Sequence, residues 1–544
     1  MFVLAFFMCA IGAQAATHII NVSSQEDFDN LNERILSLLG DVRKTKIKVV
    51  FSYGIYSFHE DHINLKNIDA PLVELSFEGN GSIIMSEGGD YANGDNFSDD
   101  VTPIESFVTT DGKDLNTWSK MLRTSNYLVE VVDKSNMLCR LNVSDLGYLS
   151  DKSEEDCRWI YIWIPQWFKG TIYKVNKIQS GYIYFFASSS DLINGDYSYG
   201  KVSQQRFKLS NNPDERGDIL ICNEHIYMPE GIGNIRHAKA TRVINSFNNN
   251  FKSISIRGLR FYGNGKQYNN NNELPENNKQ LIDLRCTDCS SVSIKNCEFK
   301  SLQVGAVNVT STNNVFIEDC CFEDCYSFCI YQERSSRVIN INNCTFHNVN
   351  KRMTNSKAIQ CRGCDFHVYD NIISDFAYCA ISAGNWYGHP DVTLNCNGII
   401  ERNEMFYTQP YFEKADEHNN MDSGAIYLYT VTNSTIVRYN HIHHYGGARG
   451  NRGIFCDDGA FNFQIYGNTI TNIGNNDWSI AARRETSLDS KFGGVNINNI
   501  IRDNIVDGPI LFEGNEKSNN GCIFEGNIHL DGNNSNDKIS NVNQ

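Results

Sequence analysis

The chain lacks an excess of basic residues. Its 544 residues include 48 Lys or Arg against 64 Asp or Glu, which gives a formal net charge of −16 and an isoelectric point of about 5.3. Because a protein that binds phosphate backbones needs a basic face, we do not expect nucleic acid as a partner. The negative charge also disfavours a strongly anionic glycan, unless a local cluster of Arg residues overrides it.

The sequence also lacks an apolar run long enough to span a membrane. The run at residues 2–11 is too short, and Ala13 and Ala15 follow it at the spacing that signal peptidase prefers. We therefore expect residues 1–15 to be a signal peptide, and the mature chain to be secreted or periplasmic with no membrane span. A buried first helix is the alternative, because no Lys or Arg precedes the run.

A short motif, apolar-x-x-(Cys or Asn)-x-apolar, recurs through the second half of the chain. The spacing between copies runs from the low twenties to the high thirties of residues. Each unit has room for short strands and a polar turn, but is too small to bury its own apolar face, so the units must stack. The pattern predicts an all-β chain folded as a parallel β-helix solenoid. The Cys or Asn positions are Cys297, Cys320, Cys344, Asn371, Asn403, Asn440, Asn468, Asn504 and Asn527.

The residue type at this position suits a stack. An Asn amide can bond to the coils above and below it. We interpret Cys297, Cys320 and Cys344 as small buried residues rather than disulfide partners, although coils about 4.8 Å apart do not exclude one bond among them. Cys139 and Cys157 are better disulfide candidates in a secreted chain.

The rest of the chain divides around this repeat. Residues 16–85 are expected to form an N-terminal cap and the first coils, with strands beginning near Lys48. Residues 86–245 break the repeat and contain strand-like runs at 159–165 and 181–186, which indicates an inserted β-rich domain; an irregular excursion without a core is the alternative. The β-helix proper covers residues 246–530, and residues 531–544 are expected to be a disordered tail.

One segment, residues 25–40, has helical periodicity. Ser24 can cap its start and Gly40 can end it. We expect the helix to cover the open first coil and shield its strand edge. Its apolar face consists of Phe28, Leu31, Ile35 and Leu38.

A second strand in each coil presents side chains to one outer groove. If its β-branched residue points inward, the residues one and three positions later point outward. Aromatic rings, amides and charged groups mix there, as in sites that bind sugars. The first outward column is Asn308, Tyr331, Gln360, Ser382, Tyr427, Phe455, Ala481 and Leu511. The second is Thr310, Glu333, Arg362, Gly384, Tyr429, Asp457, Arg483 and Glu513.

Two adjacent carboxylates, Asp457 and Asp458, stand at the end of one such strand, before Gly459. Glycoside hydrolysis needs two carboxyl groups, about 5–5.5 Å apart for retention or about 6.5–9.5 Å apart for inversion. Glu485 lies one coil further on and can meet either spacing, whereas Glu513 lies at the outer limit. The alternative is an Asx-turn that closes the coil.

Two other segments carry polar or aromatic groups. Alternation places Ile442 inward and His441 and His443 outward, where they can contact substrate or orient a carboxylate; ordinary surface histidines are the alternative, and we expect no metal site. Trp386 lies in a loop next to the groove and is a candidate platform for a sugar ring, or else a loop anchor.

The repeats over roughly residues 250–530 resemble the right-handed parallel β-helix proteins of the pectate-lyase-like superfamily. The order of the segments at 424–427, 440–443 and 453–459 looks like that of bacterial β-helix glycoside hydrolases. The resemblance implies a right-handed solenoid and acid/base cleavage of a neutral glycan without an organic cofactor. It also implies that Asp457 and Asp458 are catalytic candidates.

Three functions remain open from the sequence. In the favoured one, a glycoside hydrolase, Asp457 or Asp458 acts as general acid or nucleophile with Glu485 as the second carboxylate. A polysaccharide lyase would instead use Arg362 or Arg483 as base, with Ca²⁺ as a possible aid, although no group of three carboxylates marks a Ca²⁺ site. A non-catalytic glycan-binding protein or adhesin is the third. The expected substrate-binding residues are Arg362, Arg483, Tyr427, Tyr429, Trp386, His443 and Gln360.

Overall fold

The computed structural model describes residues 17–39, 46–88, 90–91, 106–109, 114–115, 122–123, 129–165, 170–186, 206–211, 220–222, 225–228, 235–265, 280–333, 338–349, 357–376, 378–384, 397–408, 423–429, 434–445, 452–457, 462–474, 478–483, 499–513, 523–530 and 538–540. Among these residues, no helix is long and apolar enough to cross a membrane.

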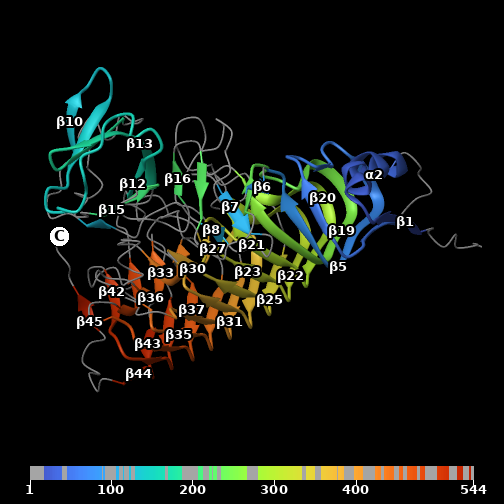
Figure 1. Cartoon of the computed structure of the whole chain (residues 1–544). Helices are drawn as coiled ribbons and strands as arrows, with labels where there is room; N and C mark the ends of the chain where they lie inside the picture. The colour runs from blue at the N-terminus through green and yellow to red at the C-terminus, as the bar shows by residue number, and fades with distance from the viewer. Residues whose placement is uncertain are drawn as a thin grey trace, which may run out of the picture.

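The body of the protein is a right-handed parallel β-helix, as the repeat and the resemblance predict (Figure 1). Its coils stack along one axis, and strands of neighbouring coils pair in parallel within a 32-stranded sheet. We name its three sides faces A, B and C, in chain order within a coil.

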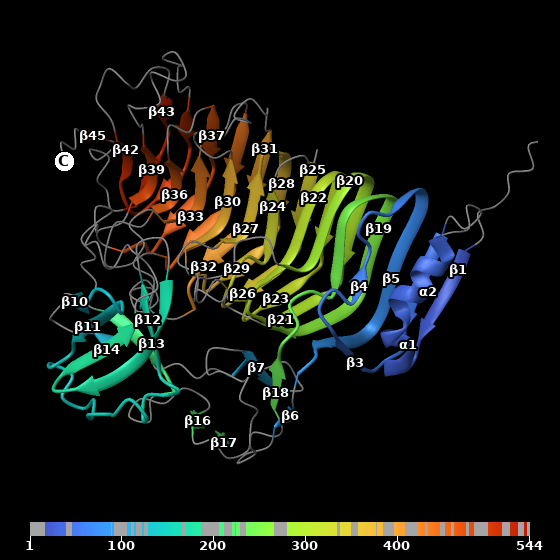
Figure 2. The ribbon, with the colours of Figure 1, turned by 90° about the horizontal axis from the view of Figure 1, so that it is seen from above.

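In the regular coils, face A carries the strand that follows face C of the preceding coil. Figure 2 shows several of its strands side by side. Its strands are β24 (Ile330–Glu333), β27 (Lys357–Arg362), β30 (Cys379–Gly384), β33 (Gly424–Tyr429), β36 (Arg452–Asp457), β39 (Trp478–Arg483) and β42 (Ile510–Glu513).

Faces B and C follow, separated by the turn that holds the Cys or Asn of the repeat. Face B consists of β25 (Val338–Asn342), β28 (Asp365–Tyr369), β31 (Gly398–Glu401), β34 (Thr435–Arg438), β37 (Phe463–Tyr466), β40 (Ile500–Arg502) and β43 (Ile523–Glu525). Face C consists of β23 (Cys321–Glu323), β26 (Thr345–His347), β29 (Ile372–Ser374), β32 (Glu404–Phe406), β35 (His441–His443), β38 (Thr469–Thr471), β41 (Ile505–Val506) and β44 (Ile528–His529).

The first coils combine four long strands with shorter ones in the same parallel sheet. The long strands are β5 (Asp69–Ser86), β19 (Ile244–Asn264), β20 (Gln280–Lys295) and β22 (Gly305–Glu318), and the shorter ones are β2 (Lys46–Phe51), β3 (Ile55–Phe58), β4 (Ile63–Asn64) and β21 (Glu298–Leu302).

Like residues stack on like along the core. On face A, Ile359, Ile381, Ile426 and Ile454 pair in register from coil to coil and are fully buried. Four phenylalanine rings stack in the early coils with centroids 4.7–5.1 Å apart: Phe261, Phe299, Phe322 and Phe346. Each such side chain contributes roughly 1.5–3 kcal/mol through burial, so the core grows with every coil.

An asparagine ladder runs along the turn between faces B and C. Asn440 illustrates the pattern: its Nδ2 donates to the Ile400 carbonyl at 2.9 Å and to Asn468 Oδ1 at 3.0 Å. Its Oδ1 accepts from the backbone N–H of Asn403 at 3.1 Å and from Asn403 Nδ2 at 3.0 Å. The ladder continues through Asn371, Asn403, Asn440, Asn468, Asn504 and Asn527.

The residue before each ladder asparagine adopts a left-handed backbone, with φ between 53° and 67°. Only Gly467 and Gly526 meet this need without a Cβ; the other turns place Asp370, Arg402, Tyr439 or Asp503 there. A non-glycine residue in that conformation costs about 1–2 kcal/mol. The hydrogen bonds of the ladder must therefore offset repeated local strain.

The N-terminal cap differs in detail from the expected single helix. Ser24 caps the start as expected, its side chain accepting from the Asp27 N–H. The segment breaks at Asn30, whose backbone leaves the helical region, into α1 (Gln25–Asp29) and α2 (Leu31–Leu39). Phe28 packs against Phe51 and Tyr56, while Gly40 lies outside the described residues.

The strands also begin earlier than expected. Strand β1 (Thr17–Val22) pairs in parallel with β2 and thereby provides the first strand of the stack. At the other end, β45 (Lys538–Ser540) pairs with β42, so the expected disorder of residues 531–544 is wrong for this short piece. The last coil has an unpaired edge that such a strand can satisfy.

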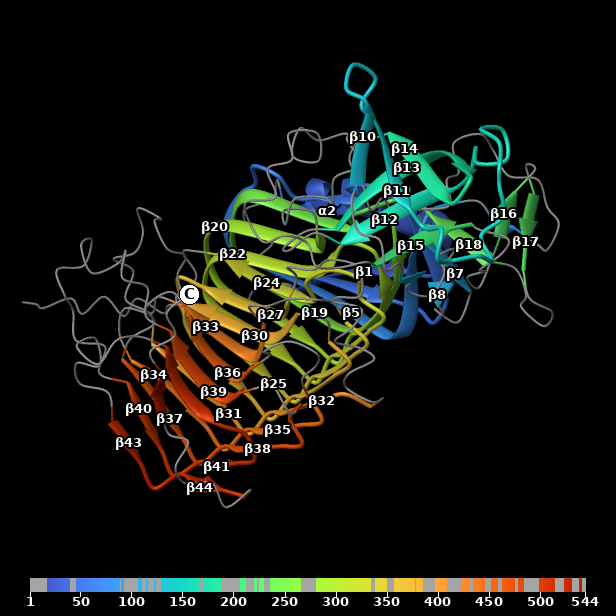
Figure 3. The same ribbon diagram turned by 90° about the vertical axis from the view of Figure 1, so that its left-hand side faces the viewer.

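The inserted residues form β-structure with a core of their own, beside the coils rather than within the stack (Figures 2 and 3). A seven-stranded antiparallel sheet has the order β10-β11-β14-β13-β12-β15-β9. Its strands are β9 (Leu122–Arg123), β10 (Val129–Asp133), β11 (Leu138–Asn142), β12 (Tyr161–Pro165), β13 (Gly170–Gln179), β14 (Tyr182–Phe186) and β15 (Arg206–Ser210). Smaller sheets consist of β6 (Asp90–Tyr91), β7 (Ser106–Thr109), β8 (Asp114–Leu115) and β18 (Ile235–Ala238), and of β16 (Leu220–Cys222) with β17 (His225–Tyr227).

The proposed disulfide between Cys139 and Cys157 is wrong. Both thiols are free and buried in the core of the insert, where they pack as small apolar groups. Cys297, Cys320 and Cys344 are also free and buried, as expected for a stack.

We predict that Asn440→Ala lowers the free energy of unfolding by about 2–4 kcal/mol, because it leaves buried backbone groups in two neighbouring turns without partners. Chemical denaturation followed by circular dichroism measures this loss. The exposed Asn314→Ala on β22 is the control and should change stability by less than about 0.5 kcal/mol. Equal effects of the two substitutions would contradict a stabilising ladder.

Candidate functional site

The columns of face A that were expected to point outward have the predicted register, but most of their described side chains are buried rather than exposed to an open groove. Tyr331, Gln360, Ser382, Tyr427 and Phe455 are paired one after another along the coils. In the second column, Glu333 pairs with Arg362, Gly384 with Tyr429, Tyr429 with Asp457, and Arg483 with Glu513. Residues about thirty positions apart therefore lie one coil, about 4.8 Å, from each other.

A buried tyrosine–carboxylate pair lies at the centre of these columns. The Tyr427 hydroxyl donates to Asp457 Oδ2 at 2.6 Å, and both residues are buried. The Tyr427 ring packs between Tyr378 and the edge of Phe455, at centroid distances of 6.0 and 5.4 Å. Since Tyr427 is only 8% exposed, its ring is not an open platform for a sugar, and its hydroxyl is the group that reaches the site.

Arg452 is a buried cation on the same face, which the sequence analysis did not single out. Its guanidinium lies 3.9 Å from the centroid of the Phe455 ring and 4.7 Å from that of the Trp478 ring. It is in register with Gly424 and Trp478, two positions before the inward isoleucine of each coil. Strand alternation from the inward Ile454 predicts an inward side chain at this position, so only the structure shows the Arg452 guanidinium turned to the Phe455 ring.

Lys357 occupies the same position of the strand, three coils earlier. Its ammonium lies 5.6 Å from the Phe328 ring centroid and 5.3 Å from that of Tyr378. Burial lowers the pKa of Lys357 to about 8, and the Arg362 guanidinium acts in the same direction. A lysine with such a pKa is partly neutral at mildly alkaline pH, so it can accept a proton.

Of the other predicted site residues, the structure describes the side chains of some but not of others. Gln360 is buried in the first column, and Arg362 is half-buried, with its backbone N–H bonded to Gln332 Oε1 at 2.9 Å. The strands holding Tyr429 and Arg483 are described, but their side chains are not. Asp458, Glu485 and Trp386 lie outside the described residues.

His443 does not belong to face A. It lies on β35 of face C, where its Nε2 is 3.2 Å from Glu404 Oε1. Ile442 is buried between the outward His441 and His443, as alternation predicts. His443 therefore contacts a carboxylate, but not one in the outward columns of face A.

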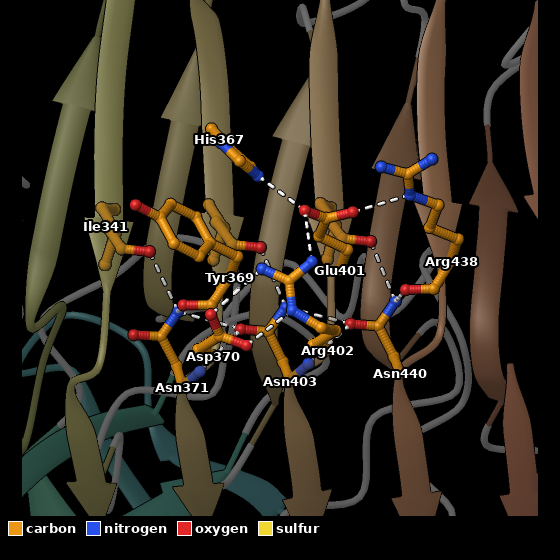
Figure 4. A network of polar contacts seen from close by, with 12 residues as sticks. Ile341, His367, Tyr369, Asp370, Asn371, Glu401, Arg402, Asn403, Arg438 and Asn440 are labelled. Atoms are coloured by element: carbon orange, nitrogen blue, oxygen red, sulfur yellow. Dashed lines mark hydrogen bonds and ion pairs between the residues drawn. The ribbon is translucent and has the colours of Figure 1, made fainter.

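Face B carries a second buried carboxylate, Glu401, in a network of cations (Figure 4). Arg438 Nε lies 2.6 Å from Oε2, while Arg402 Nη1 and His367 Nε2 lie 2.6 and 3.1 Å from Oε1. Burial would raise the pKa of Glu401, but hydrogen bonds from Arg438, Arg402 and His367 outweigh it and lower the pKa to about 2. Glu401 therefore stays ionised and ties neighbouring coils together rather than acting as an acid.

The comparisons with known proteins agree on the architecture. Residues 231–397 match the family described as "Right handed beta helix region". No curated protein matches the chain significantly in sequence.

Among solved structures, the chain is similar to one described as "Glycoside hydrolase", with 12% identity, a TM-score of 0.58, and coverage of 95% of this chain and 97% of that one. A complex of XylC with xylose is 9% identical, with a TM-score of 0.33 and coverage of 94% and 70%. The Gp54 tailspike of Acinetobacter baumannii bacteriophage AP22, in complex with a capsular saccharide, is 9% identical, with a TM-score of 0.14 and coverage of 90% and 75%. At 12% identity, the similarity to the structure described as "Glycoside hydrolase" establishes the right-handed parallel β-helix fold alone.

We predict that Glu401→Gln destabilises the protein by about 1–3 kcal/mol at neutral pH, because the paired cations lose their anion. The pKa of Glu401 falls from its ordinary 4.5 to about 2 on folding, so its contribution is fully present above pH 4.5 and is lost as the pH falls towards 2. The Tm of the wild type should thus drop more steeply in this window than that of the variant. The exposed Glu525→Gln variant should show the same dependence of Tm on pH as the wild type. Parallel Tm curves for all three proteins would contradict a stabilising role of the ionised Glu401.

Proposed function

We propose that the protein is a secreted carbohydrate-active enzyme, a glycoside hydrolase that cleaves a polysaccharide or oligosaccharide along face A. The observation that carries this proposal is the buried Tyr427–Asp457 pair. It stands among amide, cationic and aromatic side chains in register over successive coils. A sugar chain suits such a periodic row of side chains, because one rigid element presents several polar contacts in succession.

Asp457 is assigned the role of nucleophile or of the base that activates water. A phenol O–H donates to an ionised carboxylate, and it fixes the orientation of that carboxylate. Tyr427 is thus a positioning residue in this mechanism. The second carboxyl group is assigned to Asp458 or Glu485. Its separation from Asp457 would decide the stereochemistry: about 5–5.5 Å for retention and about 6.5–9.5 Å for inversion.

The cations of face A are assigned to substrate hydroxyl groups. Arg452 is held by stacking on Phe455 and Trp478, so its guanidinium has few ways to move. Gln360 and Arg362 lie two positions apart on the same strand, β27. Arginine presents several N–H donors in a fixed plane, which suits a diol on a sugar ring.

A polysaccharide lyase is the second candidate, and Lys357 is the observation that favours it. A lyase base removes a proton next to a uronate carboxyl group, and a buried lysine with a pKa of about 8 can accept it. Lys357 lies three coils from Asp457, about 14 Å along the solenoid axis, and aligns with Arg452, five positions before Asp457 on the strand, so the two mechanisms use separate parts of face A. Under this reading, cleavage would speed up as the pH rises through 8.

The first experiment is mass spectrometry of the products from a panel of neutral and acidic oligosaccharides. Fragments that carry one added water support hydrolysis. Unsaturated fragments without that water overturn the hydrolase and favour the lyase. Absence of cleavage across a broad panel, together with retained glycan binding, would favour an adhesin-type protein.

We predict that Asp457→Asn lowers kcat by about 10²–10⁴-fold, since the reacting carboxylate is lost. Tyr427→Phe should lower kcat by about 10–100-fold with little change in KM, because it removes only the hydrogen bond that orients Asp457. The exposed Asp503→Asn, in the turn between faces B and C, is the matched control and should keep full activity. Full activity of Asp457→Asn would refute the assignment, and Lys357→Met should then be tested for loss of lyase products.

A further inference from the structure

We propose that Glu404, His441 and His443 on face C bind one divalent transition-metal ion of the zinc type. The three side chains lie on adjacent coils, on β32 and β35. Their candidate ligand atoms all lie within 4.8 Å of one another. The site is separate from face A, so it does not depend on the proposed hydrolase.

The spacing of the ligand atoms suits a first-row metal ion. Glu404 Oε1 is 3.2 Å from His443 Nε2 and 3.8 Å from His441 Nδ1. A tetrahedral zinc ion with bonds of about 2.0–2.2 Å needs ligand atoms roughly 3.3–3.6 Å apart. Both distances from Glu404 Oε1 are within a few tenths of an ångström of this range, and no pair of the three atoms is more than 4.8 Å apart.

The backbone around these side chains is already fixed. Glu404 pairs in register with His441, and Phe406 with His443. The His441 N–H donates to the Asn403 carbonyl at 2.9 Å, directly after the ladder turn of Asn440. The Phe406 and His443 rings stack at 4.8 Å with planes 8° apart. The ladder and this stacking limit the freedom that binding would otherwise have to remove.

The contact with His444 permits two tautomers of His443, one of which leaves the Nε2 lone pair available to a metal ion. The two Nδ1 atoms are 2.8 Å apart, so one of them must carry a hydrogen and the other must accept it. When His443 donates, its Nε2 lone pair faces Glu404 Oε1, and two acceptors then stand opposite each other. A cation between them resolves this arrangement, and such support of the far ring nitrogen is common for histidine ligands.

The donor set indicates which metal. Two imidazoles and one carboxylate suit zinc and its neighbours, whereas Ca²⁺ and Mg²⁺ prefer oxygen ligands alone. Glu404 and His441 have side chains 42% and 47% exposed, which leaves room for water as a further ligand. The ion would join two coils, so its expected effect is to stabilise the stack.

The test is isothermal titration of ZnCl₂ into the full mature chain, chelator-treated and without a polyhistidine tag. We expect one ion per chain with micromolar or tighter affinity. Zinc in excess should raise Tm by about 1–3 °C. His443→Ala and Glu404→Gln should each weaken binding by at least about 10–100-fold. Substitution with Co²⁺ should give visible absorption bands that both variants lose.

A matched control comes from the N-terminal cap, where His59 pairs with Glu87 as an exposed couple. His59→Ala should leave zinc affinity and the Co²⁺ bands unchanged. Zinc binding that persists at full affinity in a His441→Ala/His443→Ala double variant would overturn the proposal, as would absence of binding at millimolar zinc. Glycan cleavage on face A is measured in a separate experiment, so neither zinc result decides whether the protein is a hydrolase.

Discussion

Coil-to-coil register, held by the asparagine ladder, is the constraint on which the rest of the structure depends. The side-chain amide of Asn440 donates through its nitrogen and accepts through its oxygen, with partners in the neighbouring coils. A slip of one residue would unpair the ladder and exchange inward and outward side chains on every strand. Register is thus specified by buried polar groups as well as by the apolar core.

Fixed register turns distant residues into columns of neighbours. Tyr427 reaches Asp457, Glu401 reaches Arg438, and Glu404 reaches His443, although each pair is separated by about thirty to forty positions in the sequence. Because every coil has the same height, a polar substitution in one coil gains partners only from the coils directly beside it. Sites on this scaffold are therefore combinations of two or three consecutive coils.

The sequence was sufficient to predict the solenoid and both columns of face A, because the ladder motif and strand alternation are local patterns. It was insufficient where packing between distant parts decides the outcome. The burial of the Tyr427 ring depends on Tyr378 and Phe455, and the helix break at Asn30 depends on how α1 and α2 fit the first coil. The position of Glu404 beside His441 could have been predicted, because the repeat aligns the two residues. Only the structure shows that the Glu404 carboxylate is turned towards His443.

Two of the buried carboxylates in the coils, Glu401 and Asp457, differ in the partners that surround them. Glu401 is surrounded by Arg438, Arg402 and His367, which keep it ionised and occupy both of its oxygens. The hydrogen bond that Asp457 accepts on Oδ2 comes instead from a neutral phenol, which orients the carboxylate without neutralising its charge. Cationic partners stabilise the ground state of a nucleophile and so slow its reaction, whereas a neutral donor orients a carboxylate with less stabilisation of the ground state. This difference in partners is one reason to place the proposed reaction at Asp457 on face A rather than at Glu401 on face B.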